Sequence, residues 1–295
     1  MLEELFTNME LWYHASDTDW VSRWGLVYPG VWIFVIFWVF AFGACIGSFL
    51  NVCIWRIPRG ESLSKAASHC TVCGNKIRWF DNIPIVSYLV LRGKCRACKT
   101  PYSCTYFLVE LITGSLVALA AVKAGLSQQL ASVIPLWMLL IFFGISCSVT
   151  DLRFRIVPDK LTFTGMIFAA VTSALMPAAW GTEVWWKALI YSVISGIFPA
   201  VFLAIFAVSG KFIAKRDVLG WGDVKFTMMC GMYTGSYGIF FALLAASFTG
   251  TVFGLAAKRK LDAELPFAPF IFGGVLLWIF CDRIILDIFT KLIIF

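Results

Sequence analysis

The chain has 295 residues, of which 60% are hydrophobic and 14% charged, and its formal net charge is +7. Soluble globular proteins are about 45–50% apolar and about 25% charged, so the composition excludes an ordinary soluble protein. The apolar residues come in blocks of roughly 17–25, the length of helix that crosses the hydrocarbon core of a bilayer. The sequence therefore predicts an all-α polytopic membrane protein embedded in a lipid bilayer.

Residues 1–30 form an aromatic and acidic segment that we expect to lie at the membrane interface, outside the cell membrane. A secretory signal peptide starts with basic residues, whereas the charges here are mostly acidic, as at Glu3, Glu4 and Glu10. We therefore expect the apolar stretch 31–54 to be retained as the first transmembrane helix.

The hydrophobic blocks predict about eight transmembrane helices. The long stretch 223–256 is divided in two, with a turn at Gly235-Ser236-Tyr237-Gly238, because only then does Lys258-Arg259-Lys260 fall on the same side as the other basic loops. The predicted spans are 31–54, 105–122, 131–150, 160–178, 186–208, 223–237, 238–256 and 267–290.

The basic residues are concentrated in alternate loops. The four loops 55–104, 151–160, 209–225 and 257–266 hold 19 of the 24 Lys and Arg residues. This is the bias expected of cytoplasmic loops in membrane proteins, so the net positive charge indicates topology and gives no reason to expect a nucleic-acid partner. It predicts that both termini lie outside and that these four loops face the cytoplasm.

The stretch 55–104, between the first two predicted helices, is the one region with the composition of a soluble domain. It contains Cys70-x-x-Cys73 and, after 21 intervening residues, Cys95-x-x-Cys98. Two such pairs are typical of a four-thiolate zinc site, and a metal would stabilise a region too small to bury much apolar surface. We predict a cytoplasmic zinc-binding domain with Cys70, Cys73, Cys95 and Cys98 as ligands.

Other interpretations of the cysteines remain open. Disulfides are disfavoured by the predicted cytoplasmic location, which is reducing, and the pattern does not distinguish zinc from iron. His69 abuts Cys70 and could replace a ligand, although a supporting role fits better. Cys104 breaks the spacing and is left out of the predicted site.

Two aspartates stand where long apolar stretches meet basic loops. Asp151 follows the third predicted span, and Asp223 ends the sequence Gly220-Trp221-Gly222-Asp223 and opens the sixth. An ionisable group at such a position in a membrane protein is a functional-site hypothesis by default. Asp159, which follows Pro158, is instead expected to cap the N-terminus of the fourth span.

Two converging carboxyl groups would hold one proton between them. The ionised group could then take a proton from water while the protonated group polarises the carbonyl of a peptide bond, which is aspartyl protease chemistry. Gly220 and Gly222 would let an extended peptide approach the backbone closely, with Lys225 supporting the same loop. Taken singly, Asp151 could equally be a solvated loop carboxylate, and Asp223 could be an N-capping residue after a glycine-rich turn.

Five motifs in this order resemble the type IV prepilin peptidase family, whose members are leader peptidases and N-methyltransferases. Asp151 with Ile156-Val157-Pro158-Asp159 is similar to the first catalytic motif. Gly220-Trp221-Gly222-Asp223-Val224-Lys225 is similar to the second, of GxGD type. The other three motifs are Gly47-Ser48-Phe49-Leu50-Asn51 through Pro58, the paired cysteines with Leu91-Arg92-Gly93-Lys94 before the second pair, and Pro266-Phe267-Ala268-Pro269-Phe270.

The resemblance implies catalytic roles for Asp151 and Asp223 and a seven-helix aspartyl peptidase domain over 105–295. It implies cleavage of short basic leaders after Gly from prepilins and pseudopilins, at the cytoplasmic face of the inner membrane. It also implies methylation of the new N-terminus with S-adenosylmethionine, although no motif identifies residues that bind this cofactor. One position departs from the pattern: Thr105-Tyr106-Phe107 stands where the family usually has Arg-Tyr-Pro.

Rival hypotheses are other membrane proteases and transporters. Presenilin-like proteases have a Tyr before the first aspartate and a late Pro-Ala-Leu motif, whereas here Thr150 precedes Asp151 and the late motif is Pro-Phe-Ala-Pro-Phe. Archaeal preflagellin peptidases share the two aspartates but usually lack the cysteine loop. A proton- or cation-coupled transporter would usually have two repeated halves with matching helix breaks, and no such repeat is present.

Overall fold

The computed structural model describes residues 29–63, 69–70, 72–126, 130–215, 219–256 and 265–294. Over these ranges the protein is helical, with two isolated β-bridges as its extended pairs. The chain divides into two compact units, 1–130 and 131–295. The predicted interfacial segment 1–30 lies almost wholly outside the described residues, and the predicted domain boundaries at 54 and 104 remain predictions.

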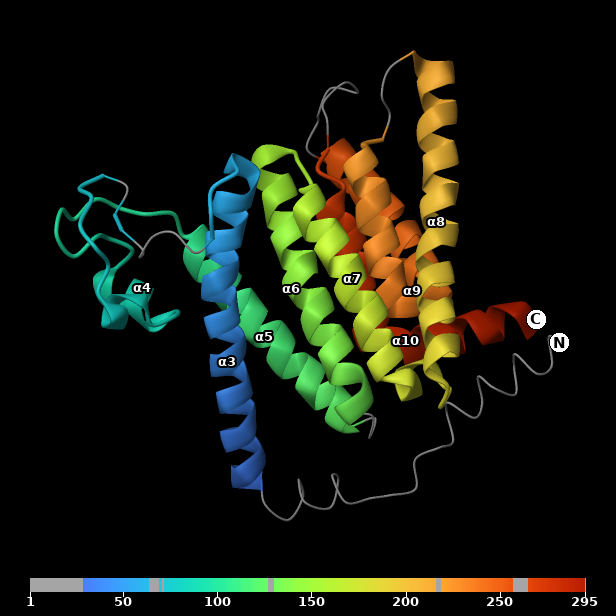
Figure 1. The fold of residues 1–295 in the computed structure, drawn as a ribbon, viewed down its shortest axis with the longest axis horizontal. Helices are drawn as coiled ribbons and strands as arrows, with labels where there is room; N and C mark the ends of the chain where they lie inside the picture. Colours follow the sequence, from blue (N-terminus) through green and yellow to red (C-terminus); the bar gives the residue numbers. More distant parts are fainter. Residues whose placement is uncertain are drawn as a thin grey trace. The chain divides into compact units, whose positions relative to one another are not determined.

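In the first unit, helices α3 (Pro29–Arg56) and α5 (Thr105–Leu126) pack along each other (Figure 1). Small residues set their separation. A Cβ at Gly43 would lie 2.9 Å from Val117 Cβ, and one at Gly47 would lie 2.8 Å from the Cα of Glu110. Both glycines are therefore required for close approach, and their four-residue spacing is the small-xxx-small pattern common at helix contacts in membranes.

Between these helices the chain forms short turns. The 3-10 helices η1 (Ile57–Arg59) and η2 (Trp79–Asn82) and the six-residue helix α4 (Val86–Leu91) are its helical elements among the described residues. The two β-bridges pair His69 with Lys76 and Lys94 with Pro101. No side chain is buried in η1, η2 or α4, so this region has little apolar core of its own.

The second unit is a bundle of five helices: α6 (Leu130–Phe154), α7 (Asp159–Leu175), α8 (Trp185–Ala214), α9 (Trp221–Ala256) and α10 (Ala268–Ile294), with the 3-10 helix η3 (Pro177–Trp180) between α7 and α8 (Figure 1). Its helices also approach closely at glycines. A Cβ at Gly231 of α9 would lie 2.5 Å from the Ser195 carbonyl oxygen of α8, and one at Gly274 of α10 would lie 2.5 Å from that of Ala242. Backbone-to-backbone packing of this kind leaves no room for larger side chains.

Helix α9 folds back on itself at Gly235. That residue has φ 76° and ψ 169°, which is not helical and is open mainly to glycine. Both ends of α9 lie near the start of α10. At the first end, Asp223 interacts electrostatically with Asp151, which bonds to Ala268. At the other end, a Cβ at Gly250 would lie within 4 Å of Phe267 and Phe270. Residues 223 and 250 of one straight helix would be about 40 Å apart, so both can lie beside the start of α10 only if the helix reverses. The predicted turn at 235–238 is confirmed.

Among the described residues, six helices are long and apolar enough to cross a membrane: Trp32–Arg59, Thr105–Gly125, Val133–Phe154, Trp185–Phe212, Trp221–Ala256 and Ala268–Ile288. Large apolar side chains on their surfaces are exposed, such as Ile33, Phe206 and Phe212, as expected for residues that contact lipid. The all-α membrane fold is confirmed. The predicted number of eight transmembrane helices is not reached on this criterion. Helix α7 is too short to be counted, with 17 residues, and α9 is counted once because it is continuous apart from its reversal.

Candidate functional site

Asp151 lies in the last turn of α6 and is only 6% exposed. Its Oδ2 accepts a hydrogen bond of 3.1 Å from the backbone N–H of Ala268, the first residue of α10. The N–H groups in the first turn of a helix have no partner within the helix, and the N-terminus of the helix favours negative charge. The start of α10 therefore supplies both a donor and a favourable field to this carboxylate.

Asp223 lies in the first turn of α9 and is partly buried. Its backbone N–H donates to the Gly220 carbonyl oxygen at 3.1 Å, which closes the turn in front of the helix. The carboxyl groups of Asp223 and Asp151 are close enough to interact electrostatically. The two sequence-predicted aspartates, 72 positions apart in the chain, thus lie within electrostatic range of each other in the second unit.

The segments that carry the two aspartates are also in contact. A Cβ at Gly222 would lie 3.0 Å from the Cβ of Val157, which follows α6 in the chain. Gly222 is thus held tightly against the loop after Asp151. Gly220 is less confined, since a Cβ there would lie 3.4 Å from Asp223 Oδ2, an ordinary contact distance.

Lys225 ties α9 to α7 through Asp159. Its Nζ lies 2.7 Å from Asp159 Oδ1, and the Asp159 side chain is 58% exposed. The prediction that Asp159 caps α7 was wrong: Pro158 occupies the N-cap position, and the carboxylate makes no capping bond. Pro158 has φ −68° and ψ 128°, so the helix begins at Asp159, one residue earlier than expected, and the Asp159 side chain is free to pair across helices.

The four predicted cysteine ligands form one cluster in the first unit. Their Sγ atoms all lie within 4.8 Å of one another, whereas His69 and Cys104 are outside the cluster that the described residues form. Each pair is presented by the same tight turn. Cys70 N–H donates to Asn75 O and Gly74 N–H to Cys70 O; in the second turn Cys95 N–H donates to Thr100 O and Lys99 N–H to Cys95 O.

The residue after each cysteine pair is left-handed, with φ 70° at Gly74 and 59° at Lys99. The two turns therefore have equivalent geometry even though only one carries a glycine. In a tetrahedral site with metal–sulfur bonds of about 2.3 Å, sulfur atoms are about 3.8 Å apart. The Cys70 and Cys98 Sγ atoms are 3.8 Å apart, which fits a metal held between the two turns.

Hydrogen bonds lower the pKa of two of the four thiols, Cys70 and Cys98, and so favour the form that binds metal. Hydrogen bonds from the Thr100 side chain and backbone lower the pKa of Cys98 to about 6. Cys98 is therefore largely a thiolate at neutral pH, and thiolates are the metal-binding form. The cluster could accordingly hold a metal ion.

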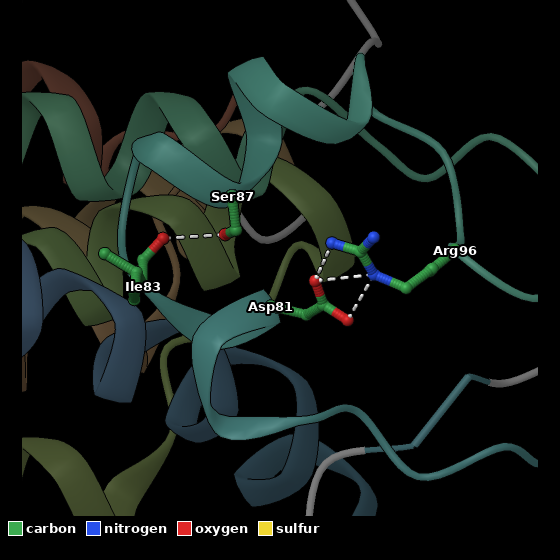
Figure 2. A network of polar contacts seen from close by, with 4 residues as sticks. All are labelled: Asp81, Ile83, Ser87 and Arg96. Atoms are coloured by element: carbon green, nitrogen blue, oxygen red, sulfur yellow. Dashed lines mark hydrogen bonds and ion pairs between the residues drawn. The ribbon is translucent and has the colours of Figure 1, made fainter.

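An ion pair joins the two halves of the cysteine region (Figure 2). The Arg96 guanidinium donates from Nε to both oxygens of Asp81, at 3.0 and 2.9 Å, and lies 2.6 Å from Oδ1 through its terminal nitrogen. Hydrogen bonding from Arg96 lowers the pKa of Asp81, which therefore stays ionised. In the same view the Ser87 hydroxyl donates to Ile83 O at 2.7 Å, closing the turn before α4.

Two partners of the site residues were missed at the level of sequence. The first is the backbone N–H of Ala268, which donates to Asp151. Pro269, at the second position of α10, is a typical mark of a helix start and could have indicated that unpaired N–H groups lie there. The other is the backbone N–H of Ile85, which donates to Glu110 Oε2 at 2.8 Å. Ile85 has φ 65°, a left-handed conformation that its β-branched side chain gives no reason to expect.

The fold defines the class as a helical membrane protein, and its second unit carries two aspartates within electrostatic range of each other. Two family models match the chain: the bacterial peptidase A24 N-terminal domain over residues 41–124 and the type IV leader peptidase family over residues 138–255. The first match covers the second half of α3, the cysteine turns and most of α5, and the second covers both aspartates. No solved structure matches the chain.

Curated relatives agree with these matches. A prepilin leader peptidase/N-methyltransferase of Stutzerimonas stutzeri is 33% identical over 273 residues, which are 80% of this chain and 88% of that protein. One of Bacillus subtilis (strain 168) is 29% identical over 252 residues, or 84% of this chain and 95% of the relative. One of Myxococcus xanthus (strain DK1622) is 33% identical over 223 residues, but the matched part is only 63% of that longer protein. The chain belongs to the prepilin leader peptidase family.

Proposed function

We propose that this protein is a membrane aspartyl endopeptidase that removes the leader from prepilins and pseudopilins, with Asp151 and Asp223 as its catalytic residues. The observation that carries the proposal is the meeting of the two carboxyl groups beside the start of α10. Family membership and the names of the relatives support the substrate class. A transporter, the alternative from another class, has no comparable support.

Peptide hydrolysis needs one ionised and one protonated carboxyl group. The ionised group takes a proton from water, whose oxygen attacks the peptide carbonyl, while the protonated group donates a hydrogen bond to the carbonyl oxygen as negative charge develops there. The N–H of Ala268 holds the Asp151 carboxyl group in a fixed orientation. The turn closed by Gly220 and Asp223 does the same for the second group.

The substrate must present an extended peptide to the pair. Glycine at the cleavage position has no side chain and lets the substrate backbone approach closely. Trp221, which is 60% exposed, and Gly220 lie at the exposed start of α9 beside Asp223. We propose that Gly220, Gly222 and Lys225 support the loop along which the substrate lies.

The charge distribution supports a topology in which the aspartates face the cytoplasm and both termini lie outside the inner membrane. The proposed eight crossings are the six long helices, with α9 counted twice because it reverses at Gly235, together with the 17-residue helix α7. Helices of about 17 residues span about 25 Å, so the membrane would be locally thin around α7. A basic leader would then lie on the side of the basic loops.

For the cysteine cluster we propose zinc, held by Cys70, Cys73, Cys95 and Cys98. The four-thiolate set, the 3.8 Å separation of Cys70 and Cys98 Sγ and the equivalent turns suit a closed structural zinc site. Its role would be to stabilise a region that has little apolar core.

We further propose that the new N-terminal amine is methylated. S-adenosylmethionine, when bound, supplies a methyl group activated by a sulfonium centre. Thr105, where the family usually has Arg, starts α5 and contacts Ser103 through its hydroxyl at 2.9 Å. Its side chain is engaged in this local contact at the helix start.

The test is a cleavage assay in liposomes with a prepilin whose leader ends in Gly. Wild type is compared with Asp151→Asn and Asp223→Asn, with S-adenosylmethionine present and the mass of the product N-terminus as the readout. We expect both variants to lose cleavage by at least about a thousandfold, because each removes one half of the acid–base pair. Asp287→Asn, which breaks only an exposed pair with Lys291 in α10, serves as the control.

Wild-type activity in either Asn variant would contradict the paired-carboxylate mechanism. A product heavier by one methyl group supports the second activity. Cleavage without methylation would limit the proposed function to proteolysis.

A further inference from the structure

The first unit contains a cavity of about 620 Å³. Pockets that bind cofactors and other small molecules are usually about 300–1,000 Å³, so this one has the size of a ligand site. Its wall is formed by the ends of α3 and α5 that face the cysteine turns, by α4, and by the cysteine turns themselves. The carboxylates proposed for proteolysis are in the other unit, so nothing described for that reaction uses this space.

Glu110 places a buried carboxyl group in the wall of the cavity, and its own bonding partners are neutral groups. It lines the cavity and is only 9% exposed. Its bonding partners are the backbone N–H of Ile85, at 2.8 Å, and the Ser48 hydroxyl, and both are neutral. A carboxylate removed from water without a cation is unfavourable, and a positively charged ligand would relieve it.

Aromatic rings form another part of the wall. Tyr88 stacks on Phe107 with ring centroids 5.2 Å apart, and Tyr102 meets Tyr88 edge to face at 5.3 Å. All three residues line the cavity. Flat aromatic surfaces of this kind accept a planar base by stacking and attract cations to their faces.

Tyr102 lies close to the Glu110 carboxyl group. Burial, and after it the negative charge of Glu110, raise the pKa of Tyr102, so its hydroxyl stays protonated as a hydrogen-bond donor. Lys76 and Arg78 also line the cavity and offer a counter-charge to an anionic group. The cavity thus combines a buried anion, stacked rings and basic groups at separate positions.

We propose that this cavity binds S-adenosylmethionine, with Glu110 facing its positively charged part and the ring cluster of Tyr88, Tyr102 and Phe107 taking its adenine. This assignment rests on the proposed methylation. The ligand carries a sulfonium, an ammonium, a carboxylate and a planar base, and the wall of the cavity offers a complementary group for each. Thr105 does not belong to the residues that line the cavity, whereas Phe107, which stands where the family usually has Pro, forms part of its wall.

The first experiment measures binding of radiolabelled S-adenosylmethionine to the full chain in nanodiscs by equilibrium dialysis. Glu110→Gln keeps a side chain of the same shape and an oxygen that can still accept the Ile85 N–H, but removes the charge. We expect its dissociation constant to rise at least about tenfold, as for loss of one charge from a desolvated pair. Glu183→Gln, an exposed residue of the second unit, should bind like wild type, and so should Asp223→Asn.

The second experiment uses wild-type protein and therefore does not depend on folding of a variant. Bound radiolabelled S-adenosylmethionine is cross-linked with ultraviolet light, and the labelled peptide is located by mass spectrometry. We expect label in residues 86–91 or 102–110. Bound metal content and unfolding temperature of Glu110→Gln are measured in parallel, and values equal to those of wild type show that this variant is folded.

The outcomes separate this inference from the proposed function. Wild-type affinity in folded Glu110→Gln, or label confined to residues 131–295, would overturn the cavity assignment and leave methylation standing. Absence of any binding to wild type would overturn both the assignment and the methyl-transfer half of the proposed function. Loss of binding in Asp223→Asn would place the ligand beside the peptidase carboxylates and would also overturn the assignment.

Discussion

The two units hold their key groups in opposite ways. In the first unit, four thiols come from two short turns that lie close in sequence, each closed by its own backbone hydrogen bonds, and the surrounding region buries few side chains. In the second unit, two carboxyl groups come from α6 and α9 and are positioned by long helices whose backbones touch at glycines. The first arrangement depends on what binds to it, whereas the second is built by the packing of the helices themselves.

This difference predicts which changes each unit tolerates. A region with little core gains most of its stability from a bound metal, so it is sensitive to its ligands. A site formed by tightly packed helices is sensitive to added volume, because the surrounding atoms have no space to yield. Three measurements test the comparison, in order of the expected effect.

The largest effect is expected from loss of a cysteine ligand. Structural zinc contributes about 10–16 kcal/mol of binding free energy in small domains, so Cys98→Ser should release the metal and unfold the cysteine turns. Limited proteolysis should then cut within residues 69–102, while circular dichroism retains the signal of the membrane helices. Cys104→Ser, outside the cluster, is the matched control and should keep both metal and protease resistance. A folded, protease-resistant Cys98→Ser protein would show that the turns do not depend on metal.

A smaller effect is expected from one methyl group in α9. The Cβ of Gly222→Ala would lie 3.0 Å from Val157 Cβ, so the first turn of the helix must shift and carry Asp223 with it. Overpacking costs about 1–3 kcal/mol, which corresponds to about a 5- to 150-fold loss of cleavage rate if the transition state bears the full strain. The readout is the rate of prepilin cleavage in liposomes.

Gly254→Ala supplies the control in the same helix, since nothing lies within 4 Å of a Cβ there. Alanine is also the better helix former, so this variant should match wild type in rate and be equal or higher in unfolding temperature. Equal rates for Gly222→Ala and wild type would mean that the second unit adapts to added volume, and the comparison between the units would fail.

The smallest effect is expected from the ion pairs. Asp81→Asn removes the negative charge that pairs with Arg96 near the cysteine turns. The Asp81 side chain is 8% exposed but that of Arg96 is 48% exposed, so solvent screens the pair, and loss of metal to a colorimetric chelator should accelerate by only about threefold. Asp159→Asn breaks the pair with Lys225 in the second unit and should leave that rate unchanged. A large acceleration in Asp81→Asn would mean that the ion pair, rather than the metal, holds the turns together.

Features encoded by neighbouring residues could be predicted from the sequence. The spacing of the cysteines was sufficient to predict their cluster, because each turn supplies two sulfurs and is closed within six residues. The reversal of α9 followed from Gly235 combined with the position of the basic residues beyond it. The placement of Asp223 in the first helical turn followed from the glycines before it.

Features that depend on distant backbone atoms could not be predicted. The donor to Asp151 is a backbone N–H 117 positions later, and every helix start offers such a group, so nothing in its side chain marks Ala268. The same holds for Glu110, whose donor is the backbone N–H of left-handed Ile85. Asp159 was misassigned because capping preference is local, whereas its ion pair with Lys225 depends on how α7 and α9 pack.

The bond between Asp151 and Ala268 also bears on the order in which the enzyme is made. Ala268 begins the last helix, so a ribosome has produced α6 and both halves of α9 before the donor to Asp151 exists. A growing chain therefore carries both aspartates in the membrane while one of them still lacks its backbone donor. The bond to Asp151 therefore forms only after α10 has been synthesised and inserted.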